Sequence, residues 1–378
     1  MTFSQQSGLR VAELTSVHLW RTRTLSLSIS DTQGAEIFSA SYRPMSAPYL
    51  VSLSVYVKGW SQSAPPLLDS IYSVGSTGNG GLSSDTTSIS SLTRLELTSL
   101  QPGHEDMRNI FICSPSLETL ILPHFGHGWR GSQEKNLPII SAPRSLRSLA
   151  VHIAYTHRVE FLLAEESTDC SCVLGSLRFP NLKYLEVLGD DSSHDLSLGS
   201  HFKDLPRLQT LRLQQCSVSP IDDDFFHSLK LLDRLELVDV EWPTKSSRET
   251  SLPFHRLSSL LISDMPSWDY ELTQWARLAR LAVQDYGCTQ FSIEVTAQLY
   301  DRMSQLFGPQ DEHIHVQVKD HVTGLLYPLP TEIFDEEDYY DSDPSDFDTF
   351  DYDYDRDFDS DGFEYAFDSQ MYLRDFDL

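Results

Sequence analysis

Aliphatic residues recur along this chain in the phrase L-x-x-L-x-[LIV], in which the last two aliphatic positions stand two residues apart. The stretch LPRLQTLRLQQCSVSP, residues 205–220, is one example, and it ends with Cys216 and Val218 in further apolar positions. A spacing of two places Leu211 and Leu213 on one face of a β-strand, whereas on a helix the two side chains would point in different directions. The pattern therefore predicts a short strand at this point of the chain.

The phrase occurs nine times, and the matches follow one another in series. They begin at Leu50, Leu92, Leu117, Leu146, Leu182, Leu208, Leu232, Leu257 and Leu278. A degenerate tenth match, with Thr22 in the first position, contains Leu25 and Leu27. Successive starts are 42, 25, 29, 36, 26, 24, 25 and 21 residues apart. Most of these spacings fall near the period of about 20–29 residues that is typical of leucine-rich repeats, and the longer ones indicate inserted loops.

The repeat predicts an α/β fold of one kind, a leucine-rich-repeat solenoid. One strand cannot bury its apolar face alone, but stacked repeats can, with parallel strands forming a concave wall and irregular helices or loops forming the outer side. The segment DDDFFHSLKLLDR (222–234) predicts a short helix on that outer side, because its aspartates suit a helix N-terminus. FPNL (179–182) and LPRL (205–208) each place a proline just before a strand, where its missing N–H costs least.

From about residue 20 to residue 290 the chain resembles the leucine-rich-repeat region of F-box proteins, particularly the irregular sets found in fungi. The resemblance lies in FPNLKYLEV (179–187), LPRLQTLRL (205–213) and SLTRLELTSL (91–100). It implies a protein-recognition module similar to the substrate-binding part of an F-box ubiquitin-ligase receptor. Most repeats lack the Asn or Cys that closes the strand in regular versions. Only Cys216 holds that place, so we expect no asparagine ladder.

The F-box itself is not found in the sequence. It is a helical module that usually lies near the N-terminus and opens with a phrase like L-P-x-E-I, and the residues before Thr22 leave no room for it. LPTEIF (329–334) looks like that opening, but the DEEDYYDSDPSD that follows cannot form amphipathic helices. We interpret LPTEIF as a coincidence and infer no binding to the ubiquitin-ligase scaffold. A lost F-box and a truncated gene product both stay open as explanations.

The pattern divides the chain into four parts. They are an N-terminal lead-in (1–21), the irregular solenoid (22–290), a C-terminal cap (291–334) and an acidic tail (335–378). Inside the solenoid, residues 73–91 are rich in Gly, Ser and Thr and predict a flexible surface loop. In the cap, FSIEVTAQLYDRMSQLF (291–307) has the apolar spacing of a closing helix, and HIHVQVKDH (313–321) alternates like an edge strand.

The tail differs in composition from the rest of the chain. Residues 335–378 contain eighteen acidic residues against Arg356 and Arg374, a net charge of −16, which leaves −11 of the total of −27 for residues 1–334. Twelve aromatic residues alternate with the acids. Closely spaced like charges without small aliphatic residues predict disorder. Such a tail either keeps the protein in solution or binds a basic protein, with carboxylates steering the encounter and aromatics supplying contact area.

The overall composition limits the partners and the compartment. A net charge of −27 argues against nucleic acid or an anionic membrane as a partner. No stretch reaches the roughly 18 apolar residues that a membrane helix needs. Five cysteines are few for 378 residues, no asparagine begins an N-x-[ST] acceptor, and the N-terminus lacks a secretory pattern. We therefore expect an intracellular protein, cytoplasmic or nuclear.

If the leucines of each strand point to the core, the residues between them point to the concave wall. The central wall residues of successive repeats are Glu96, Ile121, Ala150, Glu186, Arg212, Glu236, Leu261 and Ala282. Neighbouring strands lie about 4.8 Å apart, so Glu186, Arg212 and Glu236 should form an acid–base–acid row. Partner binding is predicted for the wall residues Tyr184, Glu186, Thr210, Arg212, Gln214, Arg234 and Glu236. The alternative is a structural ladder of exposed ion pairs, each worth about 0–1 kcal/mol.

Patterns for metal binding and catalysis are weak. The groups with suggestive spacing are His104 with His124 and His127, His313 with His315, and Cys170 with Cys172. None has further ligands at a spacing that would close a site. The glycine-rich GSTGNGG (75–81) carries no lysine, and the sequence contains no nucleophile elbow, phosphate loop or H-E-x-x-H motif. We expect no metal, no cofactor and no enzymatic activity.

Protein–protein recognition by the wall is the function that the sequence favours, with a partner of unknown identity. The alternative is a nuclear or chromatin-associated factor whose tail binds basic proteins while the solenoid only positions it. A hydrolase with an unrecognised site is a third class. Deleting the tail separates the first two, because a wall receptor should keep its partners and a tail-driven factor should lose them in moderate salt.

Overall fold

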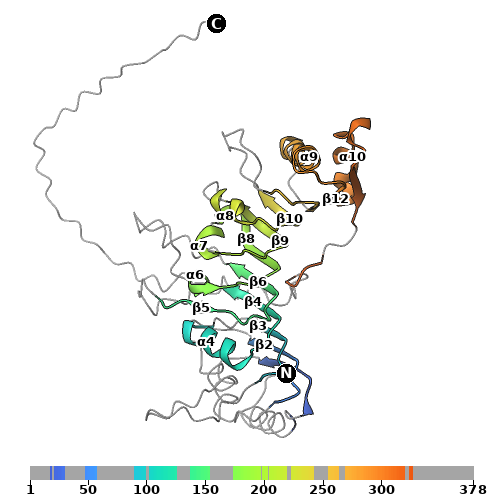
Figure 1. Ribbon diagram of the computed structural model, residues 1–378. Coiled ribbons are helices and arrows are strands. Elements are labelled where there is room, and N and C mark those ends of the chain that lie inside the picture. The colour runs from blue at the N-terminus through green and yellow to red at the C-terminus, as the bar shows by residue number, and fades with distance from the viewer. Residues whose placement is uncertain are drawn as a thin grey trace, which may run out of the picture. The chain divides into compact units, whose positions relative to one another are not determined.

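An α/β fold with one large parallel sheet of eleven strands and few helices is seen in the computed structural model of the chain (Figure 1). The structure describes residues 18, 21–29, 47–57, 89–98, 102–125, 137–153, 173–196, 198–202, 204–218, 223–241, 254–263, 269–319 and 323–326. Several sequence predictions lie outside these residues: the loop over 73–88, GSTGNGG (75–81), His127, Cys170, Cys172, LPTEIF (329–334) and the tail (335–378).

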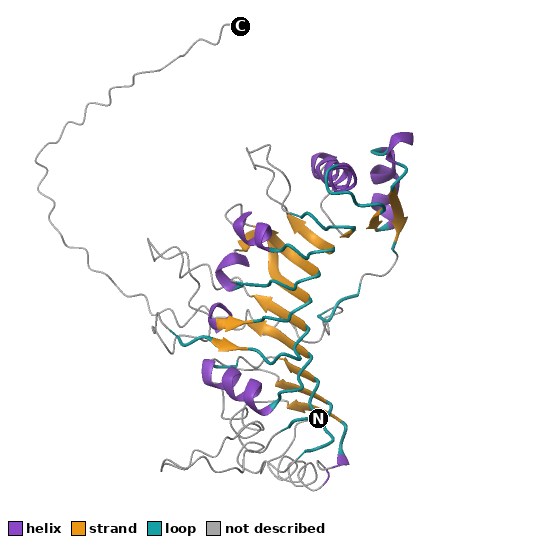
Figure 2. Cartoon of the chain, in the orientation of Figure 1, coloured by secondary structure: helices purple, strands orange, loops and turns teal. Residues whose placement is uncertain are grey.

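The strands of the main sheet are arranged in chain order, and each pairs in parallel with its neighbours. They are β1 (Thr24–Ile29), β2 (Ser52–Val57), β3 (Arg94–Thr98), β4 (Thr119–Phe125), β6 (Ser148–Ile153), β8 (Tyr184–Leu196), β9 (Thr210–Val218), β10 (Arg234–Glu241), β11 (Ser259–Ser263), β12 (Phe291–Val295) and β13 (Ile314–Val318). A second, two-stranded sheet pairs β5 (Ile140–Ser141) with β7 (Leu177–Arg178). Successive strands lie side by side along the sheet (Figure 2), and we call each strand of the main sheet a rung.

Helices lie in the connections between strands. Those within the described residues are α4 (His104–Cys113), α6 (Val173–Ser176), α7 (Leu198–His201), α8 (Asp223–Ser228), α9 (Asp269–Gln284), α10 (Ala297–Gln305) and the 3-10 turn η4 (Pro309–Asp311). The first four gather on the same side of the sheet in Figure 1. The helix predicted within 222–234 is confirmed as α8, and its Phe225 and Phe226 are buried. Parallel strands require crossovers of this kind, because a tight hairpin cannot join them.

The same turn precedes the strand in eight of the nine predicted repeats. In each, the N–H of the first leucine donates to the carbonyl of the residue three positions earlier: Leu50 to Ala47, Leu92 to Ile89, Leu117 to Ser114, Leu146 to Pro143, Leu182 to Phe179, Leu208 to Leu205, Leu232 to Leu229 and Leu257 to Phe254. Proline holds the second turn position at Pro48, Pro115, Pro180 and Pro206. This position favours the fixed φ of proline and needs no N–H. The turn therefore sets where each strand starts.

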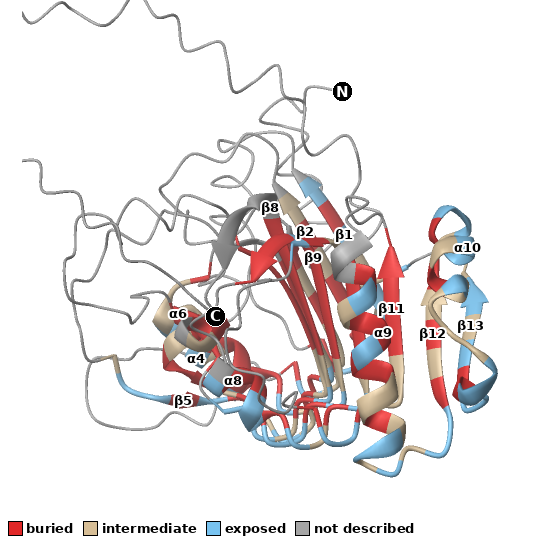
Figure 3. Ribbon diagram, turned by 90° about the horizontal axis from the view of Figure 1, so that it is seen from above, coloured by how far each residue is buried: buried red, intermediate tan, exposed pale blue. Residues whose placement is uncertain are grey.

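The leucines of the repeats share one core. The residues Leu25, Leu53, Leu95, Leu120, Leu149, Leu185, Leu211, Leu235, Leu260, Ile293 and Val316 occupy one register position across the sheet. All of them belong to or pack against the same hydrophobic cluster, and the described residues of the strands from β4 to β11 are largely buried (Figure 3). Burying one leucine contributes about 1.5–3 kcal/mol, so the rungs stabilise one another. The sequence prediction of inward-facing leucines is confirmed for these strands.

The last repeat match is wrong. Leu278 and Leu281 lie on helix α9, where Leu278, Trp275 and Ala279 are buried on one side. Leucines three apart fit a helix as well as a strand, and the apolar positions 272, 275, 276, 279 and 283 follow the helical period. The next strand is instead β12, so the stretch 291–307 is a strand followed by helix α10 rather than one cap helix. The edge strand predicted over 313–321 is confirmed as β13. The predicted boundary at residue 290 thus falls inside the sheet.

Candidate functional site

The face of the sheet opposite the leucine core carries a second aligned row. We call this face of the sheet the wall face. Its central row consists of Ser26, Ser54, Glu96, Ile121, Ala150, Glu186, Arg212, Glu236, Leu261, Glu294 and Gln317. The row exists because side chains alternate between the two faces of a strand, so every residue between two core leucines must point to this side. The predicted acid–base–acid row of Glu186, Arg212 and Glu236 is therefore present in register.

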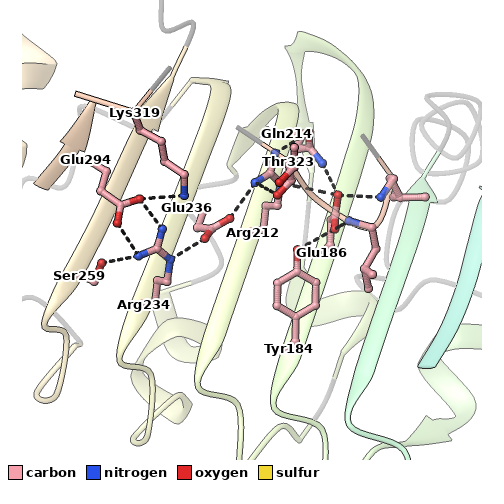
Figure 4. Close-up of polar contacts among 12 residues, drawn as sticks. Tyr184, Glu186, Arg212, Gln214, Arg234, Glu236, Ser259, Glu294, Lys319 and Thr323 are labelled. Carbon is pink, nitrogen blue, oxygen red and sulfur yellow. Dashed lines mark hydrogen bonds and ion pairs between the residues drawn. The ribbon is translucent and has the colours of Figure 1, made fainter. Parts of the chain in front are cut away.

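Glu186 on β8 accepts four hydrogen bonds on the wall face (Figure 4). Its carboxylate accepts hydrogen bonds from the hydroxyl of Tyr184 (2.7 Å) and from the side-chain amide of Gln214 (2.5 Å). It also accepts the backbone N–H groups of Leu325 (2.6 Å) and Leu326 (3.1 Å). Burial first, and then the charge of Glu186, raise the pKa of the Tyr184 phenol, so this hydroxyl stays protonated and acts as a donor.

Arg212 on β9 lies between the two carboxylates of the row. It donates to Glu236 (2.8 Å) and at longer range to the Gln214 side chain (3.4 Å) and the carbonyl of Thr323 (3.3 Å). Its Nε lies 3.6 Å from a Glu186 oxygen. The side chains of Glu186 and Arg212 are 0% and 1% exposed. The expectation of a solvent-exposed ladder is therefore wrong at these positions, because residues 323–326 cover them.

Arg234 on β10 continues the network toward the C-terminal strands. It donates to Glu236 (2.5 Å), to the hydroxyl of Ser259 (2.7 Å) and through two bonds to Glu294 on β12 (2.7 and 3.1 Å). Lys319, just after β13, donates to the same carboxylate (2.9 Å). The hydrogen bonds from Arg234, followed by those from Lys319, hold the pKa of Glu294 at about 2, against the opposing effect of burial. The bond to Glu294, helped by Glu236, raises the pKa of Arg234.

The charges of this network alternate in sign across the strands. From β8 to the end of β13 the order is Glu186, Arg212, Glu236, Arg234, Glu294 and Lys319. Three negative and three positive groups balance, so their burial is compensated locally. Carboxylate and guanidinium groups held in this way can also accept backbone N–H groups and donate to backbone carbonyls. The arrangement suits binding of a peptide main chain.

Side-chain hydrogen bonds of the wall face involve six of the seven predicted site residues. These are Tyr184, Glu186, Gln214, Arg212, Glu236 and Arg234. Thr210 lies on the same face, between Tyr184 and Arg234 in the register. Ala282, expected in the central row, is instead buried in helix α9, and Glu294 holds that row on β12. The alternation in FSIEV (291–295) is the signal that could have located Glu294.

The histidines and cysteines have ordinary surroundings where the structure describes them. The Nε2 of His104 is 2.8 Å from the carbonyl of Pro138, His315 is exposed on β13, and exposed His313 lies near Glu312. Within the described part of the chain, no group of three or more His, Cys, Asp or Glu residues is placed to hold a metal ion. Three cysteines are free thiols in this part, Cys113, Cys216 and Cys288.

Comparisons with models of protein families, with curated proteins and with solved structures return no match for this chain. Among the helices that the structure describes, none combines the length and apolarity required to cross a bilayer. The assignment of function therefore rests on the geometry of the wall face.

Proposed function

We propose that this protein is a non-enzymatic leucine-rich-repeat solenoid that recognises another protein through its wall face, inside the cell. The observation that carries the proposal is the central row, in which parallel strands present side chains at a fixed register across the sheet. Repeat proteins bind partners on extended surfaces of this kind. The resemblance to the substrate-binding region of F-box receptors points the same way, and the role proposed is that of a receptor without a visible F-box.

The N-terminal strands offer an open part of this surface. On β3, the side chains of Arg94 and Glu96 are 40% and 31% exposed, and their ion pair spans 3.3 Å. Ser54 and Tyr56 on β2 are also partly exposed on the same face. A hydroxyl, a phenol and two opposite charges within two neighbouring strands give hydrogen-bonding groups that water still reaches. We therefore assign first contact with a partner to this region.

A pair of double variants tests the assignment. Arg94→Ala with Glu96→Ala removes the wall pair, and Arg108→Ala with Glu105→Ala removes a matched pair on helix α4, where the ion pair spans 3.4 Å and the side chains are 57% and 69% exposed. Proteins cross-linked to the tagged full chain in cells are quantified for each variant and for a chain ending at residue 334. The wall variant should lose most of the partners, whereas the α4 variant and the shortened chain should keep them.

The tail supplies the second candidate function, supported by its eighteen acidic and twelve aromatic residues over 335–378. A tail-driven factor would lose its partners in the shortened chain and keep them in the wall variant. Its binding to those partners would weaken as the salt concentration rises, because salt screens the charges. That result would replace the wall proposal. The partners lost would then be basic proteins, since the carboxylates would supply the attraction.

A further inference from the structure

A short segment from beyond the last strand lies across the wall face. We call Thr323–Leu326, with the sequence TGLL, the strap. Leu325 and Leu326 donate two successive backbone N–H groups to the carboxylate of Glu186, from 139 and 140 residues away in the chain. The carbonyl of Thr323 accepts a hydrogen bond from Arg212. The strap is thus held through its main chain, by one carboxylate and one guanidinium of the wall (Figure 4).

The fit leaves no room for a side chain at Gly324. A Cβ built there would lie 2.8 Å from both the Arg212 Nε and the Glu186 Cδ, and closer still to a Glu186 oxygen. Neither neighbour can move aside easily, because both are buried and bonded within the network. The wall face therefore accepts only glycine at this position, because a side chain would clash with Glu186 and Arg212.

The leucines of the strap complete a small apolar site. Leu326 is 4% exposed and clusters with Ile121, Ala150 and Leu188, against which Leu325 also packs. These three wall residues come from β4, β6 and β8, and they form a hydrophobic cluster separate from the leucine core. The wall face therefore contains a contiguous site with one polar half, which binds main chain, and one apolar half, which binds leucine.

The polar half is not fully satisfied by the strap. Among the described residues, the buried Nε of Arg212 has no hydrogen-bond partner, although its side chain is only 1% exposed. The bond from Arg212 to the Thr323 carbonyl is also long, at 3.3 Å. This Nε lies 3.6 Å from a Glu186 oxygen, an ion-pair distance that is too long for a hydrogen bond, and leaving a buried donor without a hydrogen bond is unfavourable. A ligand that placed a carbonyl oxygen on this Nε would make a hydrogen bond that the strap does not make.

We propose that the wall face contains a peptide-binding site for an extended Gly-Leu-Leu-type segment and that the strap occupies it as an intramolecular competitor. The ligand class is a partner segment with glycine followed by two leucines or similar aliphatic residues, which offers two successive N–H groups to Glu186 and a carbonyl to Arg212. This inference rests on the proposed recognition role of the wall face and names the chemistry of its partner. Binding in trans requires displacement of the strap, so the free protein is held in a closed state.

A labelled peptide of the chain's own residues 319–328, KDHVTGLLYP, tests the proposal. Its binding is measured by fluorescence anisotropy to the full-length protein and to two full-length variants that release the strap, Gly324→Val and Leu326→Asp. Both changes lie outside the wall itself, so the site stays intact. Because a tethered segment competes at an effective concentration in the millimolar range for short linkers, the variants should bind the peptide at least tenfold more tightly than the native chain. Circular dichroism checks that each variant is folded.

The matched control is the same peptide with valine in place of its glycine, which should bind none of the three proteins. A second measurement needs no variant: excess peptide should speed hydrogen exchange at the amides of Leu325 and Leu326 in the native protein, while exchange in β9 stays slow.

If the peptide binds neither released variant, or binds native and released chains equally, the strap is only a structural cap and the proposal is overturned. Should that happen while Arg94→Ala with Glu96→Ala still abolishes partner capture, the proposed function survives. If the peptide binds but every partner tolerates that wall variant, the assignment of first contact to β2 and β3 fails and the peptide site stands.

Discussion

Arg234 on β10 donates two parallel hydrogen bonds to Glu294 on β12 and so joins two strands that are separated by β11. The pair spans the intervening strand at Ser259, whose hydroxyl accepts a further bond from the same guanidinium. Bidentate pairs of this kind are stronger and more directional than single contacts. The polar network of the wall face therefore connects rungs that are not neighbours, in addition to the backbone ladder that connects those that are.

The stability of the C-terminal rungs should depend on pH through Glu294. Arg234 lowers the pKa of this carboxyl from the ordinary 4.5 to about 2 in the folded protein. A lowered folded-state pKa means that the unfolded chain binds the proton more readily, so the contribution is complete above pH 4.5 and is lost as the pH falls toward 2. Glu294→Gln should lower the free energy of unfolding by roughly 2 kcal/mol at pH 7, and the difference should shrink below pH 4.

Urea denaturation of both proteins from pH 3 to pH 7 measures this effect. Glu105→Gln is the control, because Glu105 pairs with Arg108 on the surface of α4 and its side chain is 69% exposed. Its effect should stay within about 1 kcal/mol at every pH. A constant difference between the native protein and Glu294→Gln over the whole range would contradict the prediction.

Removing Arg212 should destabilise the protein far more than removing an exposed arginine. Arg212→Ala leaves the carboxylates of Glu186 and Glu236 buried without their shared counter-charge, a change that costs about 3–5 kcal/mol. Arg108→Ala on α4 should cost about 0–1 kcal/mol. Thermal or urea denaturation compares the two variants. Adding Glu186→Gln and Glu236→Gln to the Arg212 variant should recover part of the loss, and a loss from Arg212→Ala alone below 1 kcal/mol would show that the network is not stabilised in this way.

The repeat could be predicted from the sequence because each rung carries its own signal. Leucines two apart set the strand, and a four-residue turn, often with proline, sets its start, as at Pro206 and Leu208. The sequence predicts Glu186 beside Arg212 for the same reason, since the two residues hold the same position in successive repeats. These are local or nearest-neighbour properties, and a linear pattern contains them.

The burial of those charges could not be predicted in the same way. It depends on residues 323–326, which meet Glu186 from 139 residues away and carry no repeat pattern. The strand predicted from the phrase at Leu278 is wrong for a different reason. The spacing L-x-x-L fits a helix as well as a strand, and this segment forms helix α9, which packs against β12 and β13. The sequence pattern does not predict contacts between distant segments. It also does not assign the secondary structure where one pattern fits both a helix and a strand.

The thiols should differ sharply in reactivity. Burial, followed by the charge of Asp239, raises the pKa of Cys216 to about 12, and burial raises the pKa of Cys113. Cys288 is partly exposed. In a chain with Cys170 and Cys172 changed to serine, three thiols remain of the five. Since the thiolate is the reactive form, Ellman's reagent at pH 8 should titrate one thiol quickly and the other two only in denaturant. Rapid reaction of all three in the folded protein would contradict the buried positions.

The backbone bends at Gln215 on β9 and at Asp239 on β10, and a glycine should relieve the strain at such a bend. Gln215 and Asp239 have φ angles of 47° and 53°, in the left-handed region that costs an L-residue about 1–2 kcal/mol. At Gln215 the strand turns so that Cys216 can again point into the core, where it is 1% exposed. Because the Gln215 side chain is exposed, Gln215→Gly removes the strain without removing a packed group. It should therefore raise the free energy of unfolding by about 0.5–1 kcal/mol, the relief being partly offset by the greater freedom of glycine in the unfolded chain.

Gln209→Gly is the matched control for this change. Gln209 is also exposed and directly precedes β9, but it is not among the residues with positive φ. Glycine there brings only the entropic penalty, so the free energy of unfolding should fall by roughly 0.5–1 kcal/mol. Urea denaturation of the two variants should thus give changes of opposite sign. If both substitutions destabilise the protein to the same extent, the bend at Gln215 does not carry the strain that its backbone angle implies.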